Sequence, residues 1–222
     1  MSETLLYYTP GTCSMSELIC LEWIGEPYRL CRVEREQRQS KAFLALNPHG
    51  SVPAMRVDDR VLVENGVLLV HLADHAPAAE LIAPVGTPER DEIHFWLSYI
   101  ASRYHAAHFP IFKTGRYSDR EDLHDHLREV AIEQVGKELA FLDEKFTGRD
   151  FAVGGKRSIV DAYFVAVARW ARRFFEYEDT CPEFDRYLKR WDADTGVQRA
   201  ALIEAGEITG PDGALLEHVA LG

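Results

Sequence analysis

The 222-residue sequence has few basic side chains for its size and no long apolar run. Lysine and arginine number 25 against 36 aspartate and glutamate residues, so the formal net charge is −11 with neutral histidines. Nucleic-acid-binding proteins and proteins of anionic membrane surfaces depend on clustered cations, so this balance argues against both classes. No segment approaches the ~20 apolar residues of a membrane-spanning helix. We therefore expect no nucleic-acid or membrane partner, although an anionic small molecule needs only a locally positive site.

Cysteine is also scarce, and the four cysteines show neither a CxxC pair nor the spacing of a metal site; they are Cys13, Cys20, Cys31 and Cys181. The N-terminus has no basic segment followed by a long apolar run, so it does not resemble a secretory signal. These absences predict reduced thiols, a cytoplasmic location and no bound metal. Hydrophobic residues make up 46% of the chain without low complexity, which is enough for one large or two modest domains without disulfides.

The first third of the chain alternates short apolar runs with helical patterns. The apolar run 5–8 stops at a Thr-Pro-Gly turn and predicts a buried strand, and helical spacing follows over 14–24 until Gly25 ends it. Later patterns predict a strand at 28–33, a short helix at 40–46, a hairpin over 52–63 and a helix at 65–75. The predicted order is therefore βαβαββα.

Segment 77–88, with three prolines and a glycine, breaks any helix, and only helical patterns follow it. The clearest helical patterns run over 89–108, 119–146, 158–175 and 182–205. The fold class that these patterns predict is α/β plus all-α. Its parts are an N-terminal domain over 1–78, a linker over 79–88 and an all-helical domain over 89–222.

Cys13 lies in the turn that opens the first predicted helix. Unpaired backbone N–H groups and the positive end of a helix dipole favour a thiolate over a thiol, so Cys13 is a candidate reactive sulfur. The alternative is a small buried residue at a turn. Cys20, inside a helical pattern, and Cys31, in a predicted strand, fit that alternative better.

Two further segments hold candidate binding groups. A cis bond between Val52 and Pro53 would turn the backbone outward toward an extended peptide, and an ordinary trans turn is the alternative. Asn65 is a good N-cap for the helix that it opens. In a second interpretation, Asn65 and the helix start bind a carboxylate while Glu64 accepts a hydrogen bond from an ammonium group. An α-amino acid group would satisfy both.

Ser98, Ser102 and His105 have the spacing i, i+4, i+7, so they share one face of a predicted helix. A histidine on such a face could exchange a proton with a thiol. The polar side of an ordinary surface helix is the alternative.

Ser158 and Asp161 form an S-x-x-D start to an apolar helix. In such a capping box each side chain accepts from the backbone N–H of the other residue. We interpret this pair as structural.

Taken in order, these motifs resemble the cytosolic glutathione transferases, and YYTPGTCSMS is similar to the N-terminal motif of their bacterial beta class. NPHGSVPAM resembles the loop with the family's cis-proline, VENGVLLVHLAD the segment that holds the γ-glutamyl end, and GGKRSIVDAYFVAVARW the family's buried capping box. The resemblance extends to about residue 205. It implies an N-terminal thioredoxin-like domain followed by an all-helical domain.

The resemblance also implies a homodimeric enzyme that uses glutathione as co-substrate and acts in detoxification. Such an enzyme conjugates glutathione to a small hydrophobic electrophile or exchanges it with disulfides. The catalytic residues implied are Cys13, His105 and Tyr8. The glutathione-binding residues implied are Arg38, Val52, Pro53, Glu64, Asn65, Ser98 and Ser102. Relatives often carry lysine immediately after the matching histidine, where this chain has Ala106, so one cation is missing from the site.

Two alternatives remain open on the sequence. One is a glutathione-dependent isomerase or reductive dehalogenase, and the other is a non-catalytic binding protein of the same fold. The isomerase branch typically has a serine-rich first motif with an arginine, which differs from the setting of Cys13. The presence of Cys13, Pro53 and Glu64 favours a transferase over a binding protein.

Overall fold

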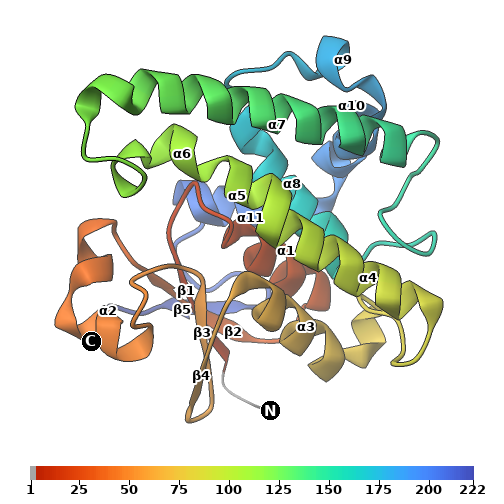
Figure 1. Cartoon of the computed structure of the whole chain (residues 1–222). Helices are drawn as coiled ribbons and strands as arrows, with labels where there is room; N and C mark the ends of the chain where they lie inside the picture. The colour runs from red at the N-terminus through yellow and green to blue at the C-terminus, as the bar shows by residue number, and fades with distance from the viewer. Residues whose placement is uncertain (1–3) are drawn as a thin grey trace.

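The computed structural model describes residues 4–222 and begins with a strand, a helix and a second strand (Figure 1). β1 (Thr4–Tyr8) and β2 (Tyr28–Arg32) are parallel, and α1 (Met15–Ile24) connects them. Gly25 ends α1 in the left-handed conformation, with φ of 71°, which a residue without a side chain adopts at little cost.

A hairpin completes the predicted part of the sheet. β3 (Ala54–Val57) and β4 (Arg60–Val63) are antiparallel, and β3 also pairs antiparallel with β1. α2 (Lys41–Leu46) precedes the hairpin and α3 (Asn65–His75) follows it. The order β1-α1-β2-α2-β3-β4-α3 confirms the predicted βαβαββα unit.

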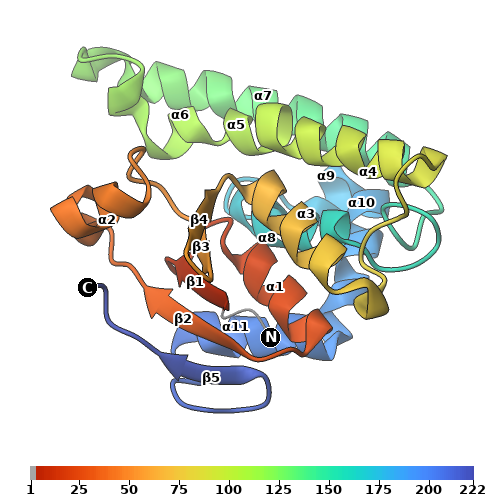
Figure 2. The same ribbon diagram turned by 90° about the horizontal axis from the view of Figure 1, so that it is seen from below.

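The rest of the chain is largely helical. Its α-helices are α4 (Pro88–Tyr99), α5 (His105–Ala107), α6 (Phe109–Phe112), α7 (His124–Phe146), α8 (Ile159–Ala171), α9 (Tyr177–Thr180), α10 (Pro182–Lys189) and α11 (Thr195–Ala205). A π-helix, η3 (Ile100–Tyr104), joins α4 to α5. The 3-10 helices of the chain are η1 (Glu36–Gln39), η2 (Pro77–Ala79), η4 (Thr114–Arg116), η5 (Glu121–Leu123) and η6 (Arg190–Ala193). α1 packs against both α8 and α11, so the helical part covers the first helix directly (Figure 2).

α8 begins with the predicted capping box. The Asp161 carboxylate accepts from the Ser158 N–H at 2.7 Å and from the Ser158 hydroxyl at 2.8 Å. It also accepts from the Ala152 N–H at 2.9 Å and from the Tyr187 hydroxyl at 2.8 Å. The box therefore joins α8 to the preceding loop and to α10 as well as closing its own helix end.

The C-terminal tail corrects one sequence prediction. Residues 89–222 were expected to be all helical, but β5 (Leu215–His218) pairs in parallel with β2, and the sheet order is β4-β3-β1-β2-β5. Arg29 of β2 and Glu217 of β5 form an ion pair at 2.8 Å. The strand forms because β2 would otherwise leave its outer backbone groups unpaired, a requirement that local sequence patterns do not reveal.

The predicted linker over 79–88 falls between the end of α3 at His75 and the start of α4 at Pro88. Only the short η2 turn precedes it there. Across the described residues, no helix is both long enough and apolar enough to cross a membrane.

Candidate active site

Cys13 lies in the loop between β1 and α1, two residues before the helix begins. Hydroxyl groups close this loop. Thr12 Oγ1 donates to the Thr9 carbonyl at 2.7 Å, and Ser14 Oγ accepts from the Thr9 N–H at 3.3 Å. The Cys13 side chain is 7% exposed, and its thiol donates to the Val52 carbonyl oxygen at 3.9 Å. The fold thus brings together two of the predicted segments, 39 residues apart in the chain.

The Val52–Pro53 loop offers backbone groups beside Cys13. Its peptide bond is cis, one of the two alternatives open on the sequence. Within residues 4–222, neither the N–H nor the C=O of Val52 pairs with another backbone group, whereas β3 is paired from Ala54 onward. Apart from the contact of its carbonyl with the Cys13 thiol, the Val52 backbone is therefore available to pair with an extended ligand.

The protonation state of Cys13 differs from the sequence prediction. Burial raises the pKa of the Cys13 thiol far above its usual range, and the negative charge of Glu17 raises it further. A backbone hydrogen bond and the guanidinium groups of Arg169 and Arg38 lower this pKa, but by less. The prediction of a thiolate is wrong because desolvation outweighs the helix terminus. Cys13 is a thiol at neutral pH.

The sequence predicted Asn65 as the N-cap of α3, but the structure places it inside the helix. Glu64 is the N-cap residue and Asn65 is the first residue of the helix. The Asn65 side-chain amide donates to Ser16 Oγ at 3.0 Å, and that hydroxyl donates to the Cys13 carbonyl at 2.7 Å. Asn65 therefore braces the loop of Cys13. Glu64 is exposed and has a φ of 74°, a strained backbone conformation of the kind that concentrates at functional sites.

Arg38, in η1, reaches the same loop. Its Nε–H donates to Thr9 Oγ1 at 3.2 Å, and Thr9 Oγ1 donates to the Val33 carbonyl at 2.5 Å. The Nη2 atom of Arg38 is buried and has no hydrogen-bond partner among residues 4–222. A buried guanidinium nitrogen without an acceptor is costly, so this position suits an anionic ligand group.

His105 is linked to the Cys13 side of the molecule through Tyr163 of α8. His105 Nδ1 and the Tyr163 hydroxyl are 3.0 Å apart. Burial raises the pKa of Tyr163, and electrostatic interactions with Cys13, Glu17 and Glu64 raise it further. Burial, followed by the positive charges of His108 and Lys113, lowers the pKa of His105 to about 4, so its imidazole is neutral at pH 7. Sequence patterns gave no signal for Tyr163, which lies inside an apolar helix.

The predicted shared face of Ser98, Ser102 and His105 crosses a change of helix type. Both serines are exposed, and the Ser102 hydroxyl donates to the Ser98 carbonyl at 2.8 Å. The π-helix η3 lies between Ser98 and His105. A π turn contains more residues than an α turn, so the 100° spacing behind the prediction does not hold across it.

Tyr8 packs beside the C-terminal strand β5. Its ring is 1% exposed and packs at 6.2 Å from the His218 ring of β5. Burial raises the pKa of Tyr8 to about 12, while the Arg32 charge lowers it and the Glu204 charge raises it by smaller amounts. The Tyr8 side chain points toward the C-terminal tail because alternate residues of a strand face opposite sides of the sheet.

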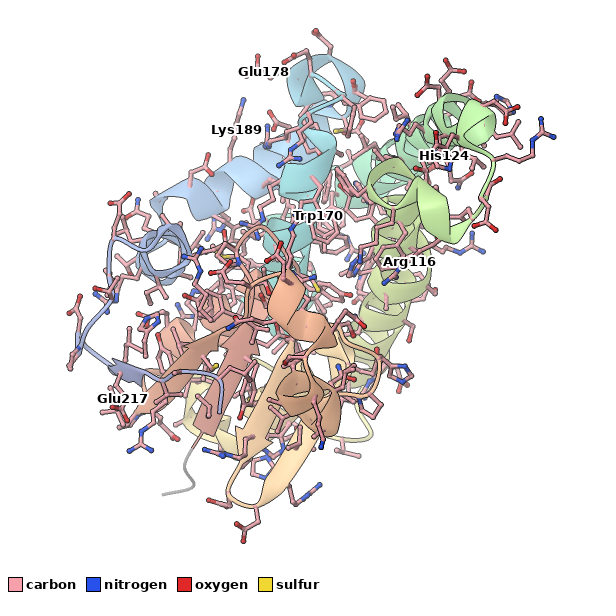
Figure 3. All side chains as sticks on the ribbon, turned by 90° about the vertical axis from the view of Figure 1, so that its left-hand side faces the viewer. Arg116, His124, Trp170, Glu178, Lys189 and Glu217 are labelled. Carbon is pink, nitrogen blue, oxygen red and sulfur yellow. The ribbon has the colours of Figure 1, made fainter. Side chains whose placement is uncertain are left out.

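Side chains of α8 and α11 hold the loop before Cys13. Arg169 Nη2 donates to the Thr12 carbonyl at 2.7 Å and to Glu204 Oε1 at 2.9 Å. Glu204 Oε1 also accepts from the Gly11 N–H at 3.0 Å. Trp170, labelled in Figure 3, donates from Nε1 to the Gly11 carbonyl at 3.1 Å. The three contacts to the loop itself span 157 to 193 residues, so no local motif could have revealed them.

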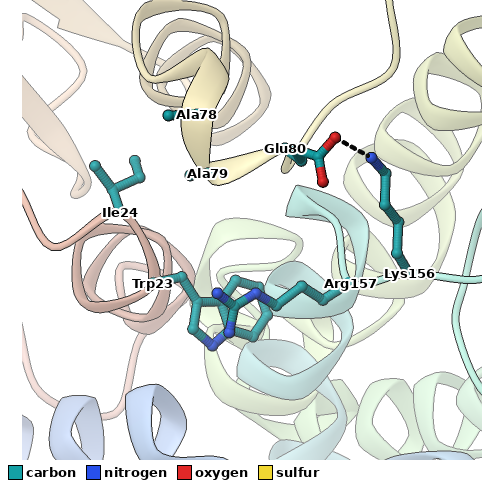
Figure 4. Close-up of a pocket in the computed structure, with 7 residues that line it drawn as sticks. All are labelled: Trp23, Ile24, Ala78, Ala79, Glu80, Lys156 and Arg157. Carbon is teal, nitrogen blue, oxygen red and sulfur yellow. Dashed lines mark ion pairs between the residues drawn. The ribbon is translucent and has the colours of Figure 1, made fainter.

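A cavity of about 440 Å³ lies at the other end of α1 (Figure 4). The Arg157 guanidinium lies 5.3 Å from the centre of the Trp23 ring, and Lys156 pairs with Glu80 at 3.1 Å. The charged side chains that line this cavity thus already contact other residues of the cavity. Cys13 does not line it. The described part of the chain contains no group of three or more histidine, cysteine or carboxylate side chains that could hold a metal ion.

Comparison with known proteins gives matches over most of the chain. Residues 6–80 match the family model of the glutathione S-transferase N-terminal domain, and residues 93–191 match that of the C-terminal domain. A curated glutathione S-transferase of Xanthomonas campestris is 30% identical over 199 residues, which cover 90% of this chain and 98% of that protein.

Two solved structures resemble this chain over most of its length. The glutathione transferase homologue from Sulfitobacter, with bound glutathione, has a TM-score of 0.84 and 26% identity, covering 94% of this chain and all of that one. The beta-class glutathione S-transferase of Sphingomonas chungbukensis has a TM-score of 0.79 and 29% identity, covering 90% of this chain and 98% of that one.

Proposed function

The chain belongs to the glutathione S-transferase family and is a glutathione transferase, and from this premise we propose that glutathione binds where Cys13 meets the Val52–Pro53 loop. The observation that carries this proposal is the 3.9 Å approach of the Cys13 thiol to the Val52 carbonyl. A cysteinyl unit that pairs with the Val52 backbone has its own sulfur close to Cys13.

The two charged ends of glutathione meet complementary groups on either side of this point. The exposed Glu64 carboxylate accepts from the ammonium of the γ-glutamyl end, and the start of α3 attracts its carboxylate. Arg38 binds the glycyl carboxylate, which supplies the acceptor that its buried Nη2 lacks. Asn65 supports this arrangement from beneath through Ser16 rather than by contact with the ligand.

The protonated Cys13 thiol favours conjugation as the main activity. A thiol donates a hydrogen bond to the glutathione thiolate and so stabilises it, and that thiolate then attacks an electrophilic carbon. His105, neutral at pH 7, holds the Tyr163 hydroxyl on the same side. Conjugation of small electrophiles is the chemistry of detoxification, and turnover of an aryl halide with glutathione by the purified protein tests it directly.

Thiol-disulfide exchange is the secondary activity. Cys13 attacks one sulfur of oxidised glutathione, a mixed disulfide forms, and the other half leaves as a thiolate that takes up the Cys13 proton. Because the pKa of Cys13 is raised, the adduct forms slowly at pH 7 and faster as the pH rises.

Replacing Cys13 with alanine tests this assignment. Cys13→Ala should keep its affinity for glutathione to within about threefold, because the backbone of Val52 and the charges of Glu64 and Arg38 carry most of the binding. It should lose the mixed disulfide entirely, as measured by intact mass after incubation with oxidised glutathione at pH 8. Cys31→Ala, at a buried strand position, is the matched control and should form the adduct normally. One glutathionyl group on Cys13→Ala would place the chemistry on another cysteine.

We also propose that two copies associate through α3, α4 and α7. Large apolar side chains are exposed on all three helices: Val67 is 51% exposed, Phe95 53% and Val130 49%. Arg90 and Asp74 join α3 to α4 through two hydrogen bonds of 2.9 Å, so these two helices are held to each other. Exposed apolar groups on one rigid face are typical of a subunit interface.

Phe95→Asp should convert the dimer to a monomer, because a buried unpaired carboxylate would be costly at a subunit interface. Light scattering coupled to size exclusion measures the mass in solution. Val85→Asp is the control, since Val85 is 84% exposed but lies in the segment before α4. A monomeric wild-type protein, or a dimer that persists in Phe95→Asp, would contradict this interface.

A further inference from the structure

Partly exposed aromatic rings gather around Trp170, next to the loop of Cys13. The Trp170 ring centre lies 4.9 Å from that of His105 and 6.3 Å from that of Phe112, which is itself 6.4 Å from the ring of Phe174. Phe112 is 44% exposed and Phe174 is 39% exposed. Trp170 anchors this group to the site, since it donates to the Gly11 carbonyl. Exposed aromatic clusters at a binding site mark a surface that receives an apolar ligand.

Two cations lie over rings of the same cluster. Lys113 Nζ is 5.7 Å from the centre of the Phe109 ring, which in turn is 5.0 Å from the His105 ring. Arg173 lies 5.8 Å from the centre of the Phe112 ring. In the described chain, neither Lys113 nor Arg173 forms an ion pair with a carboxylate. Both therefore keep their positive charge available to a ligand.

More positive charge faces the same region from other elements. Arg116 of η4, Arg38 of η1 and Arg35 beside η1 all act on Lys113 as positive charges. Within residues 4–222, none of these three arginines is ion-paired either. Figure 3 places Arg116 on the face of the molecule that also presents Trp170. Arg38 pairs with glutathione in the proposed complex, and the remaining cations make this a locally positive surface in a chain of net charge −11.

We propose that the electrophile this enzyme prefers is an aromatic anion, whose ring packs on Trp170 and Phe112 while its carboxylate or sulfonate faces Lys113 and Arg173. The inference rests on the proposed glutathione site and adds the substrate class to it. Lys113 thus provides from the end of α6 a cation that Ala106 does not supply. Neutral aromatic electrophiles use the same rings without the ionic contact.

With an aryl halide, the reaction is a substitution in which sulfur replaces chlorine on the ring. The glutathione thiolate forms a C–S bond at the ring carbon that carries chlorine, the C–Cl bond breaks, and chloride leaves with the bonding pair. The proton of the glutathione thiol passes to solvent. The cations bind the anionic substituent only and take no part in bond making or breaking.

The test compares two substrates that differ at one substituent, the anionic 4-chloro-3,5-dinitrobenzoate and its neutral methyl ester. The wild-type enzyme should have a KM for the acid at least about threefold below that for the ester, the size expected for one or two exposed ionic contacts. The preference should shrink in 0.5 M salt, because exposed charges are screened. Rates are corrected for the uncatalysed reaction of each substrate with glutathione.

The double variant Lys113→Met and Arg173→Met should raise the KM for the acid about threefold or more while that for the ester changes less than twofold. The KM for glutathione is measured in parallel. Arg60→Met is the control, since Arg60 is an exposed cation on β4, far from α6 (Figure 1). It should leave both values unchanged.

Other results separate the two levels of the proposal. Equal KM values for acid and ester, or a double variant that raises the KM for glutathione instead, would overturn the substrate class and leave the glutathione site intact. Failure to turn over either substrate would overturn the proposed conjugating function and the substrate class with it.

Discussion

Asp161→Ala should lower the free energy of unfolding by about 3–5 kcal/mol, because four buried donors lose their acceptor at once. These donors are the N–H groups of Ala152 and Ser158 and the hydroxyls of Ser158 and Tyr187, and all three residues are at most 4% exposed. Each buried donor without a partner costs about 1–3 kcal/mol. Urea unfolding of the purified protein at pH 7.5 measures the change.

The unfolding measurement is made at pH 7.5 because Asp161 is ionised there. Burial raises the pKa of Asp161 to about 6, while the hydrogen bonds from Ala152, Tyr187 and Ser158 lower it. The carboxylate is therefore ionised at pH 7.5 and accepts all four hydrogen bonds. Asp161→Asn should be intermediate, because its amide has one acceptor oxygen in place of two.

Asp150→Ala provides the control for this prediction. Asp150 is in the same loop region but is exposed, and it pairs with Arg186 at 2.9 Å on the surface. Its removal should cost less than about 1 kcal/mol. If the Asp150 and Asp161 variants lost the same free energy of unfolding, the capping box would contribute no more to stability than a surface ion pair does.

Arg169→Met should loosen the loop that carries Cys13 and so raise the alkylation rate of this thiol about tenfold or more. Methionine cannot donate to the Thr12 carbonyl, and it leaves the Glu204 carboxylate, whose side chain is 12% exposed, without its partner. The loss of stability should be about 1–3 kcal/mol, because Arg169 itself is only partly buried. Iodoacetamide labelling of the folded protein, followed by mass spectrometry, measures the rate at Cys13.

Two further variants distinguish positioning of the loop from a general loss of stability. Arg172→Met removes a neighbouring ion pair, with Asp185, on the same helix without touching the loop. It should lose stability while Cys13 labelling stays at the wild-type rate. Arg169→Lys keeps the charge but lacks the planar fork, so it should restore stability better than it restores the slow labelling.

The kinetic consequence is specific as well. A loop held by Arg169 and Glu204 sets the position of the Cys13 thiol that stabilises the glutathione thiolate. Arg169→Met should therefore lower kcat about tenfold with a smaller change in the KM for glutathione. If the KM for glutathione alone rose while kcat stayed constant, Arg169 and Glu204 would serve glutathione binding rather than positioning of the Cys13 thiol.

The sequence alone determined most of the local architecture. Apolar runs broken by glycine and proline predicted the βαβαββα order, because strands and helices impose different spacings on apolar residues. Ser158 and Asp161 predicted their capping box, because that motif is complete within four residues. The family motifs likewise pointed to glutathione before any contact was known.

Only the tertiary structure decided the properties that depend on distant groups. Burial and Glu17 keep Cys13 a thiol, although its place before a helix had predicted a thiolate. The π-helix η3 interrupts the regular α-helical spacing between Ser98 and His105, and His105 Nδ1 lies 3.0 Å from the Tyr163 hydroxyl.

The same holds for contacts that cross most of the chain. Glu204 reaches Gly11 across 193 residues, and β5 pairs with β2 although nothing in its own residues indicated a strand. Spacing in a sequence describes neighbours within a few turns. Desolvation, charge and edge pairing depend instead on which remote segments the packed core brings into contact.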